Sequence, residues 1–245
     1  MVARAGGHRA GVGGLIQASS VPSGTGPNFE KELLMKIGIL GGTGDAGRGI
    51  GLRLAMAGHE VCLGSRDGAR AISVAEDLAH SGLQGASNEE AAVFGPVVII
   101  AVPWESAHAV AAAAAEGLQG RIVVSMVNAL AFVEGQPEPI IPPSGSLAMG
   151  LQAQLRGSRV VAAFHHLPAR LLMQREAALD MDVLVCGDDP EALAEIRELT
   201  DSIEGLRAID AGGLTNASAI EALTPVLIGI NMRARRRTGI RIQGL

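Results

Sequence analysis

The chain has 245 residues, of which 48% are hydrophobic, and a net charge of -5. This apolar content can form a buried core and excludes a disordered protein, and the acidic balance provides no general basic surface for nucleic acid. The sequence has no tyrosine and only two lysines, Lys31 and Lys36. It therefore excludes mechanisms that need a catalytic tyrosine and leaves almost no room for a catalytic lysine.

The first 34 residues differ in composition from the rest. They contain seven glycines and no hydrophobic periodicity, which predicts a flexible tail. The segment that follows, from Met35 to Leu40, is typical of the first strand of a dinucleotide-binding protein that starts at its initiator methionine. We therefore expect residues 1–34 to be an extended gene start or vector-derived residues, with a transit peptide as the less favoured alternative.

From Met35 onward, short apolar runs alternate with stretches of helical periodicity. Strands are predicted at 36–40, 60–63, 97–102, 122–127, 160–164 and 182–186. Helices are predicted at 46–57, 69–80 and 105–116, from Pro190 onward, and at 215–232. Strands that are apolar throughout are buried on both faces, so we expect an α/β fold with a Rossmann-type parallel sheet covered by helices.

The segment 135–144 is rich in proline and polar residues and is predicted to be a loop near a domain boundary. We expect a dinucleotide-binding domain over 35–156 and a smaller C-terminal α/β lobe over 157–245. The helix at 215–232 is apolar on nearly all sides, which predicts burial in the core or in a dimer interface. Cys62 and Cys186 lie in strand-like segments, where two buried free thiols are expected rather than a disulfide.

A glycine-rich turn follows the first predicted strand. Its motif G-x-G-x-x-G spans Gly42, Thr43, Gly44, Asp45, Ala46 and Gly47. The first glycine allows a tight turn, the second lets a pyrophosphate approach the backbone, and the third lets helix and strand pack. The N–H groups at the start of the next helix then face the phosphates. Because this motif directly follows the first predicted strand and opens a helix, it predicts a dinucleotide-binding site.

The residues after the second strand select between the two dinucleotides. A site for NAD would place Asp or Glu there to bind the ribose 2′-hydroxyl. This chain has Ser65 and Arg66 instead, with Arg70 one helical turn further on. A hydroxyl beside guanidinium groups suits a 2′-phosphate, so the sequence favours NADP. Asp67 is interpreted as a helix cap, and no His, Cys or Asp spacing indicates a metal.

Without tyrosine or a spare lysine, the site suits a hydride acceptor that needs little proton transfer from the protein. Six motifs that occur in order along the body of the chain resemble the family of coenzyme F420-dependent NADP oxidoreductases. They are Ile37–Gly44, Gly64–Arg66, Val102–Glu105, Phe164–Pro168, Val185–Asp189 and Leu223–Pro225. The resemblance extends from about Met35 to Ile242. It implies direct hydride transfer between NADP(H) and coenzyme F420, and a homodimer. The two expected free thiols favour a location in the cytoplasm.

The resemblance also implies roles for individual residues. Thr43, Ser65, Arg66 and Arg70 would hold the 2′-phosphate. The nicotinamide half of NADP would be bordered by Val102, Pro103, Trp104 and Val127. His165 and Leu167 would line the cleft where the two rings meet, as the catalytic residues. Trp104 is equally well explained as a packing residue, and His166 as a hydrogen-bonded residue at a strand end.

Other interpretations stay open on the sequence alone. One is an NADPH-dependent reductase of another flavin-like or imine substrate, and another is a non-catalytic module that senses NADP. The basic run of Arg233, Arg235, Arg236 and Arg237 is either a solvated helix end or a contact for the anionic tail of F420. The longest apolar run, 91–104, is too short to cross a bilayer, so no membrane partner is expected.

Overall fold

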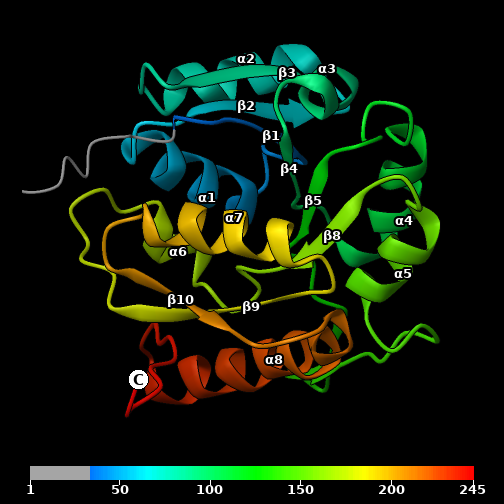
Figure 1. The fold of residues 1–245 in the computed structure, drawn as a ribbon. Helices are drawn as coiled ribbons and strands as arrows, with labels where there is room; N and C mark the ends of the chain where they lie inside the picture. Colours follow the sequence, from blue (N-terminus) through cyan, green and yellow to red (C-terminus); the bar gives the residue numbers. More distant parts are fainter. Residues whose placement is uncertain (1–33) are drawn as a thin grey trace, which may run out of the picture. The chain divides into compact units, whose positions relative to one another are not determined.

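The computed structural model describes residues 34–245 (Figure 1). The predicted tail at 1–34 therefore lies outside the described residues, apart from Leu34. The described part is a central sheet covered by helices on both faces. In residues 34–245 no helix has both the length and the apolar character needed to cross a membrane.

The central sheet has eight strands in the spatial order β10-β9-β8-β5-β4-β1-β2-β3. Its strands are β1 (Lys36–Leu40), β2 (Glu60–Ser65), β3 (Leu83–Ser87), β4 (Val97–Ile100), β5 (Ile122–Ser125), β8 (Arg159–Ala162), β9 (Met181–Gly187) and β10 (Leu206–Asp210). A separate hairpin consists of β6 (Leu130–Val133) and β7 (Gln136–Pro139), which pair antiparallel.

Six of the eight strands are mutually parallel, namely β8, β5, β4, β1, β2 and β3 in their spatial order. Their order around β1 is that of a Rossmann sheet, in which the chain turns to one side after β1 and crosses to the other side before β4. Strand β9 runs antiparallel to β8, and β10 is parallel to β9. The predicted α/β class with a Rossmann-type parallel sheet is confirmed. The domain boundary at 156–157 stays a prediction.

The helices are α1 (Asp45–Met56), α2 (Gly68–Asp77), α3 (Asn88–Val93), α4 (Trp104–Ala113), α5 (Leu147–Gln154), α6 (Ala169–Leu172), α7 (Pro190–Asp201) and α8 (Ala217–Ala234), with a 3₁₀ turn at Leu214–Asn216 before α8. Side chains cap several of them. Asp67 accepts a hydrogen bond from the backbone N–H of Arg70 and so begins α2, as predicted. Asp189 caps α7 in the same way, with Pro190 in its first turn.

Two apolar clusters fill the spaces on the two faces of the sheet. One packs α1 and α7 against the strands through residues such as Ile50 and Ile196. The other packs α4, α5 and α8 through small and branched side chains such as Ala111 and Leu151. Figure 1 shows α1 and α7 on one side of the sheet and α4 and α5 on the other. Both sheet faces are buried, which is why the strands read as uninterrupted apolar runs.

The prediction of a loop at 135–144 was wrong over its first half. Gln136–Pro139 forms β7, which pairs with Leu130–Val133. The turn between them places both Glu134 and Gly135 at positive φ, which matches the twist of a two-residue hairpin. The hairpin could not be predicted from the sequence because β7 is short, contains two prolines and lacks the alternating pattern of a half-buried strand. The sequence also did not predict β3, α3, α5 or β10.

Candidate functional site

The predicted site residues follow the carboxyl ends of neighbouring parallel strands. They are Gly42–Gly47 after β1, Ser65, Arg66 and Arg70 at the end of β2 and beyond it, Val102–Trp104 after β4, Val127 after β5, and His165 and Leu167 after β8. Because these strands are parallel and adjacent, all of these residues lie along one edge of the sheet. We call the part at β1, β2 and β4 the phosphate end, and the part at β5 and β8 the histidine end.

The glycine loop of the phosphate end has the packing that its motif requires. Gly42 donates a hydrogen bond to the Gly64 carbonyl at 2.8 Å, and a Cβ on Gly42 would lie 2.8 Å from the Leu63 Cα. A Cβ on Gly47 would lie 2.7 Å from the Gly42 Cα. A Cβ on Gly44, in contrast, would come no closer than 3.5 Å to the rest of the protein. The space beside Gly44 is therefore left for a ligand, as expected for a pyrophosphate.

A cleft of about 480 Å³ opens beside this loop. It brings together seven of the predicted residues: Thr43, Gly44, Ser65, Arg66, Arg70, Val102 and Pro103. Its lining does not include Gly42, Asp45, Ala46, Gly47, Trp104, Val127, His165 or Leu167. Of these, Gly42 and Gly47 support the loop from beneath, whereas Asp45 is exposed and pairs with Arg48 at 2.6 Å. Ala46 and Trp104 pack against the two apolar clusters.

The two arginines of the cleft are available to an anion. Arg66 and Arg70 are exposed, and within residues 34–245 neither forms an ion pair. Ser65 is nearly buried at the end of β2, and its hydroxyl accepts a hydrogen bond from the Asp67 N–H at 3.2 Å. Asp67 caps α2 through the Arg70 N–H, and within residues 34–245 it forms no ion pair with Arg66 or Arg70. These features fit the 2′-phosphate that the sequence predicts.

The sequence did not identify Asn88, which also lines the cleft. It is the first residue of α3 and is 8% exposed, and its Oδ1 accepts a hydrogen bond from the Gly41 N–H at 3.1 Å. Asn88 thereby ties the glycine loop to α3. The Ser87-x-x-Glu90 capping box, which encloses Asn88, is the sequence pattern from which the start of α3 could have been predicted.

An apolar wall completes the phosphate end. The wall is the face of α4 and its C-terminal turn formed by Ala109, Val110, Ala113 and Ala114, all of which line the cleft. Small aliphatic side chains beside two guanidinium groups provide a flat surface that suits an aromatic base. Residue types this common carry no sequence signal, so this wall could be found only from the fold.

The histidine end is rich in buried polar atoms without hydrogen-bond partners. Among residues 34–245, seven buried side-chain nitrogen or oxygen atoms have no hydrogen-bond partner, and five of them are here. These five are the Ser125 Oγ, the Asn128 Oδ1, both ring nitrogens of His165 and the His166 Nδ1. Buried polar groups are nearly always paired in folded proteins, so this concentration sets the histidine end apart from the rest of the described residues.

His165 is held by its backbone while its ring stays unpaired. Its carbonyl accepts hydrogen bonds from the Asn128 Nδ2 at 2.9 Å and from the Thr224 Oγ1 at 3.1 Å. The preceding residue, Phe164, is fully buried and has φ of 66°, in the left-handed region that non-glycine residues rarely adopt. Burial, followed by the proximity of His166, lowers the pKa of His165 to about 3. The imidazole is therefore neutral at pH 7.

Comparison with known proteins identifies the family. The family described as NADP oxidoreductase, coenzyme F420-dependent, matches residues 36–129. An F420-dependent NADP reductase of Methanocaldococcus jannaschii is 40% identical over 222 residues, which cover 86% of this chain and 99% of that protein. The chain belongs to the F420-dependent NADP reductase family. The reductase of Methanothermobacter marburgensis is similar at 38% identity over the same shares of the two chains.

A solved structure agrees with this membership of the F420-dependent NADP reductase family. The crystal structure of an Arthrobacter protein assigned as an F420-dependent NADP-reductase superposes with a TM-score of 0.74. The two chains are 31% identical, and the match covers 85% of this chain and 99% of the other. The overall fold is therefore shared over most of the chain.

Proposed function

We propose that this chain is an oxidoreductase that transfers a hydride directly and reversibly between NADP(H) and coenzyme F420. The observation that carries the proposal is the arrangement of one edge of the sheet. At one end of this edge, a cleft holds two free guanidinium groups and an open glycine loop. At the other end lie a buried neutral histidine and further buried polar atoms without partners.

The phosphate end is proposed to bind NADP. Thr43, Ser65, Arg66 and Arg70 would hold the 2′-phosphate, and the N–H groups around Gly44 at the start of α1 would hold the pyrophosphate. Val102 and Pro103, which line the cleft after β4, would direct the nicotinamide half toward the histidine end. Trp104 and Val127 are proposed to support this half from the apolar core.

The histidine end is proposed to hold the deazaflavin. When both coenzymes are bound, the nicotinamide carbon 4 and the deazaflavin carbon 5 supply the hydride chemistry themselves. The protein then needs only to orient the two rings and exclude water. His165 would serve as a neutral hydrogen-bonding partner rather than as a general acid, since its pKa lies about 4 units below neutral pH. Leu167, at 8% exposure, would keep the ring contact dry.

A homodimer in the cytoplasm is part of the proposal. Apolar side chains are exposed on α8 at Val226, Ile230 and Met232, and on the neighbouring hairpin at Phe132 and Val133. Such a patch on a surface helix supports a protein contact. Cys62 and Cys186 are both buried free thiols, which supports a reducing compartment. Sedimentation of the purified protein would test the dimer.

Deuterium transfer provides the experiment for the hydride step. The protein is mixed with NADPH that carries deuterium at carbon 4 and with oxidised F420, and the loss of the deazaflavin absorbance band is followed. Direct transfer places the deuterium in reduced F420, whereas a path through solvent loses it. Turnover with a flavin or an imine but not with F420 would instead favour the other reductase, and binding of NADPH with no turnover would favour a sensor.

A further inference from the structure

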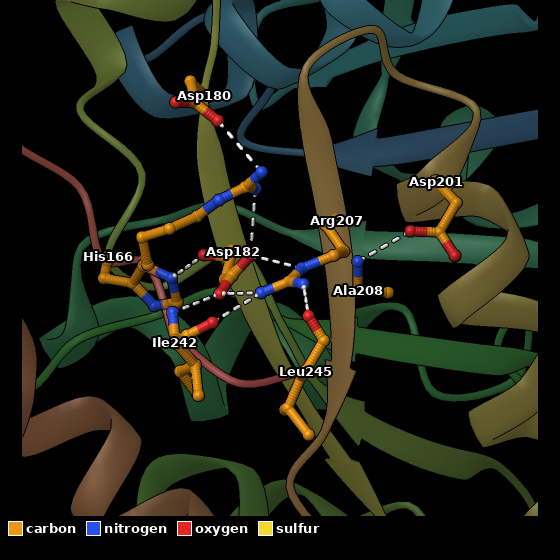
Figure 2. A network of polar contacts seen from close by, with 9 residues as sticks. His166, Asp180, Asp182, Asp201, Arg207, Ala208, Ile242 and Leu245 are labelled. Atoms are coloured by element: carbon orange, nitrogen blue, oxygen red, sulfur yellow. Dashed lines mark hydrogen bonds and ion pairs between the residues drawn. The ribbon is translucent and has the colours of Figure 1, made fainter.

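The C-terminal residues Ile240–Leu245 are fastened to the sheet next to the histidine end. The anchor is Asp182 near the start of β9, whose side chain is fully buried. Its carboxylate accepts hydrogen bonds from the Arg207 Nε and Nη2, both at 2.8 Å, and from the Arg241 Nη1 at 3.1 Å. It also accepts one from the Ile242 N–H at 2.5 Å. Figure 2 shows the carboxylate enclosed by these groups.

Backbone contacts extend the same clamp. The Asp182 N–H donates to the Ile240 carbonyl at 2.8 Å. Arg207, besides its two bonds to Asp182, donates to the Ile242 carbonyl at 2.8 Å and to the Leu245 carbonyl at 2.7 Å. The guanidinium and carboxylate groups thus saturate one another and the carbonyls of the last residues, an arrangement that holds a chain end more firmly than packing alone.

The clamp reaches the histidine end through His166. The Nε2 of His166 forms a hydrogen bond of 2.8 Å with the Asp182 carbonyl, so Nε2 carries the proton (Figure 2). Strand β8 ends beside β9, where Ala162 pairs with Cys186, and the turn that follows β8 brings the His166 ring to the Asp182 carbonyl. His165 and the strained Phe164 immediately precede His166.

We propose that the C-terminal segment Ile240–Leu245, which Asp182 and Arg207 clamp and which contributes its own Arg241 to the clamp, is a positioning element that holds His166 and thereby sets the ring of His165. A left-handed backbone at Phe164 persists only where the surroundings over-determine it. Three anchors do so here: Asn128 and Thr224 on the His165 carbonyl, and Asp182 on the His166 ring. This inference rests on the proposed role of His165 in the F420 reaction, but its structural part can be tested independently.

The test compares two variants of the clamp with a matched surface variant. Asp182→Asn removes the negative charge that Arg207 and Arg241 bind. Arg241→Gln removes one donor to Asp182 while leaving the Asp182–Arg207 pair. Arg197→Gln is the control, because Arg197 forms a surface ion pair with Asp210 at 3.6 Å, away from Asp182. Hydrogen exchange of the backbone is measured over 240–245 and 164–167, together with steady-state kinetics for F420 and NADPH.

We expect both clamp variants to accelerate exchange in 240–245 and in 164–167. We expect kcat/KM for F420 to fall by about tenfold in Asp182→Asn, as small displacements of a positioned group cost this much or more. Arg241→Gln should show a smaller fall, and Arg241→Lys should restore part of the protection. The KM for NADPH should stay within about twofold, because the phosphate end is built from other strands. Arg197→Gln should match the wild type.

Faster exchange in 240–245 without any change at 164–167 would overturn the proposal, because the clamp would then fasten only the chain end. The same holds if the F420 kinetics of folded Arg241→Gln equal those of the wild type. If Asp182→Asn does not fold, the Arg241 variants decide. Should the wild type show no turnover with F420, the proposed function fails, and the coupling between 240–245 and 164–167 is still decided by exchange.

Discussion

The two ends of the site are built in opposite ways. The anion-binding part of the phosphate end consists of backbone N–H groups, glycines and exposed arginines that come from short stretches directly after β1 and β2. The histidine end consists of buried side chains that come together from β5, β8, β9 and α8. An anion needs charge and N–H groups but tolerates water, whereas two stacked redox rings need a dry and rigid surface.

This difference determines how substitutions at each end should affect folding and catalysis. The arginines of the phosphate end are exposed and come from a short local stretch, so they can be changed with little effect on folding. The histidine end depends on contacts between residues far apart in the sequence, such as Thr224 with His165 and His166 with Asp182. Changes there should alter stability and catalysis together. The following predictions test this contrast.

The largest effect is expected from removing both cleft arginines. Arg66→Gln combined with Arg70→Gln should weaken NADPH binding by about a hundredfold, or roughly 3 kcal/mol, because charge-assisted hydrogen bonds to a phosphate are lost. NADH binding should change little, since it lacks the phosphate, and the melting temperature should not move because both side chains are exposed. Titration calorimetry with both dinucleotides measures this. An equal loss for NADPH and NADH would show that the arginines do not contact the 2′-phosphate.

Two glycines of the same loop should respond differently. Gly47→Ala places a Cβ 2.7 Å from the Gly42 Cα and should lower the free energy of unfolding by about 2 to 3 kcal/mol through overpacking. Gly44→Ala has room for its Cβ within the protein and should leave the free energy of unfolding nearly unchanged while weakening NADPH binding. Urea unfolding and calorimetry separate the two effects. If Gly44→Ala binds NADPH normally, the pyrophosphate does not lie beside Gly44.

The histidine end should contribute to the pH dependence of the free energy of unfolding. His165 has its pKa lowered from 6.5 to about 3 in the folded chain, so between these values the unfolded chain binds the extra proton and stability falls as the pH falls. From pH 7 to pH 5 this residue should reduce the free energy of unfolding by about 2 kcal/mol. His165→Gln should lack that part of the decrease, whereas Arg66→Gln should retain it. Identical pH slopes for wild type and His165→Gln would contradict a buried neutral imidazole.

The smallest effect is expected at the basic run at the C-terminal end of α8. Arg233, Arg235, Arg236 and Arg237 are all exposed and form no ion pair within residues 34–245. If they attract the anionic tail of F420, replacing Arg235, Arg236 and Arg237 by Gln should raise the KM for F420 about threefold at low salt, and added salt should abolish the difference. An unchanged KM at low salt would leave the run as a solvated helix end.

Much of the architecture could be predicted from the sequence because the signals are local. β1 was predicted with its observed bounds, and the predicted caps Asp67 and Asp189 are confirmed, because apolar runs and capping residues act over a few positions. Strands β3 and β10 were missed because their residues are only partly buried and their sequences contain glycine or charged residues. The hairpin of β6 and β7 was missed because its strands are short and mostly exposed and because β7 contains two prolines.

For the site, the sequence by itself determined the chemistry of the phosphate end. The glycine spacing and the Ser65–Arg66 pair specify backbone conformation and charge within a few residues, and the absence of tyrosine excluded several mechanisms. Only the tertiary structure decided that Asn88 braces the loop and that five buried polar atoms without partners lie at the histidine end, two of them on the His165 ring. It also decided that residues 240–245 are held by Asp182 and Arg207. Those features depend on burial and on distances between residues remote in sequence, which no local pattern encodes.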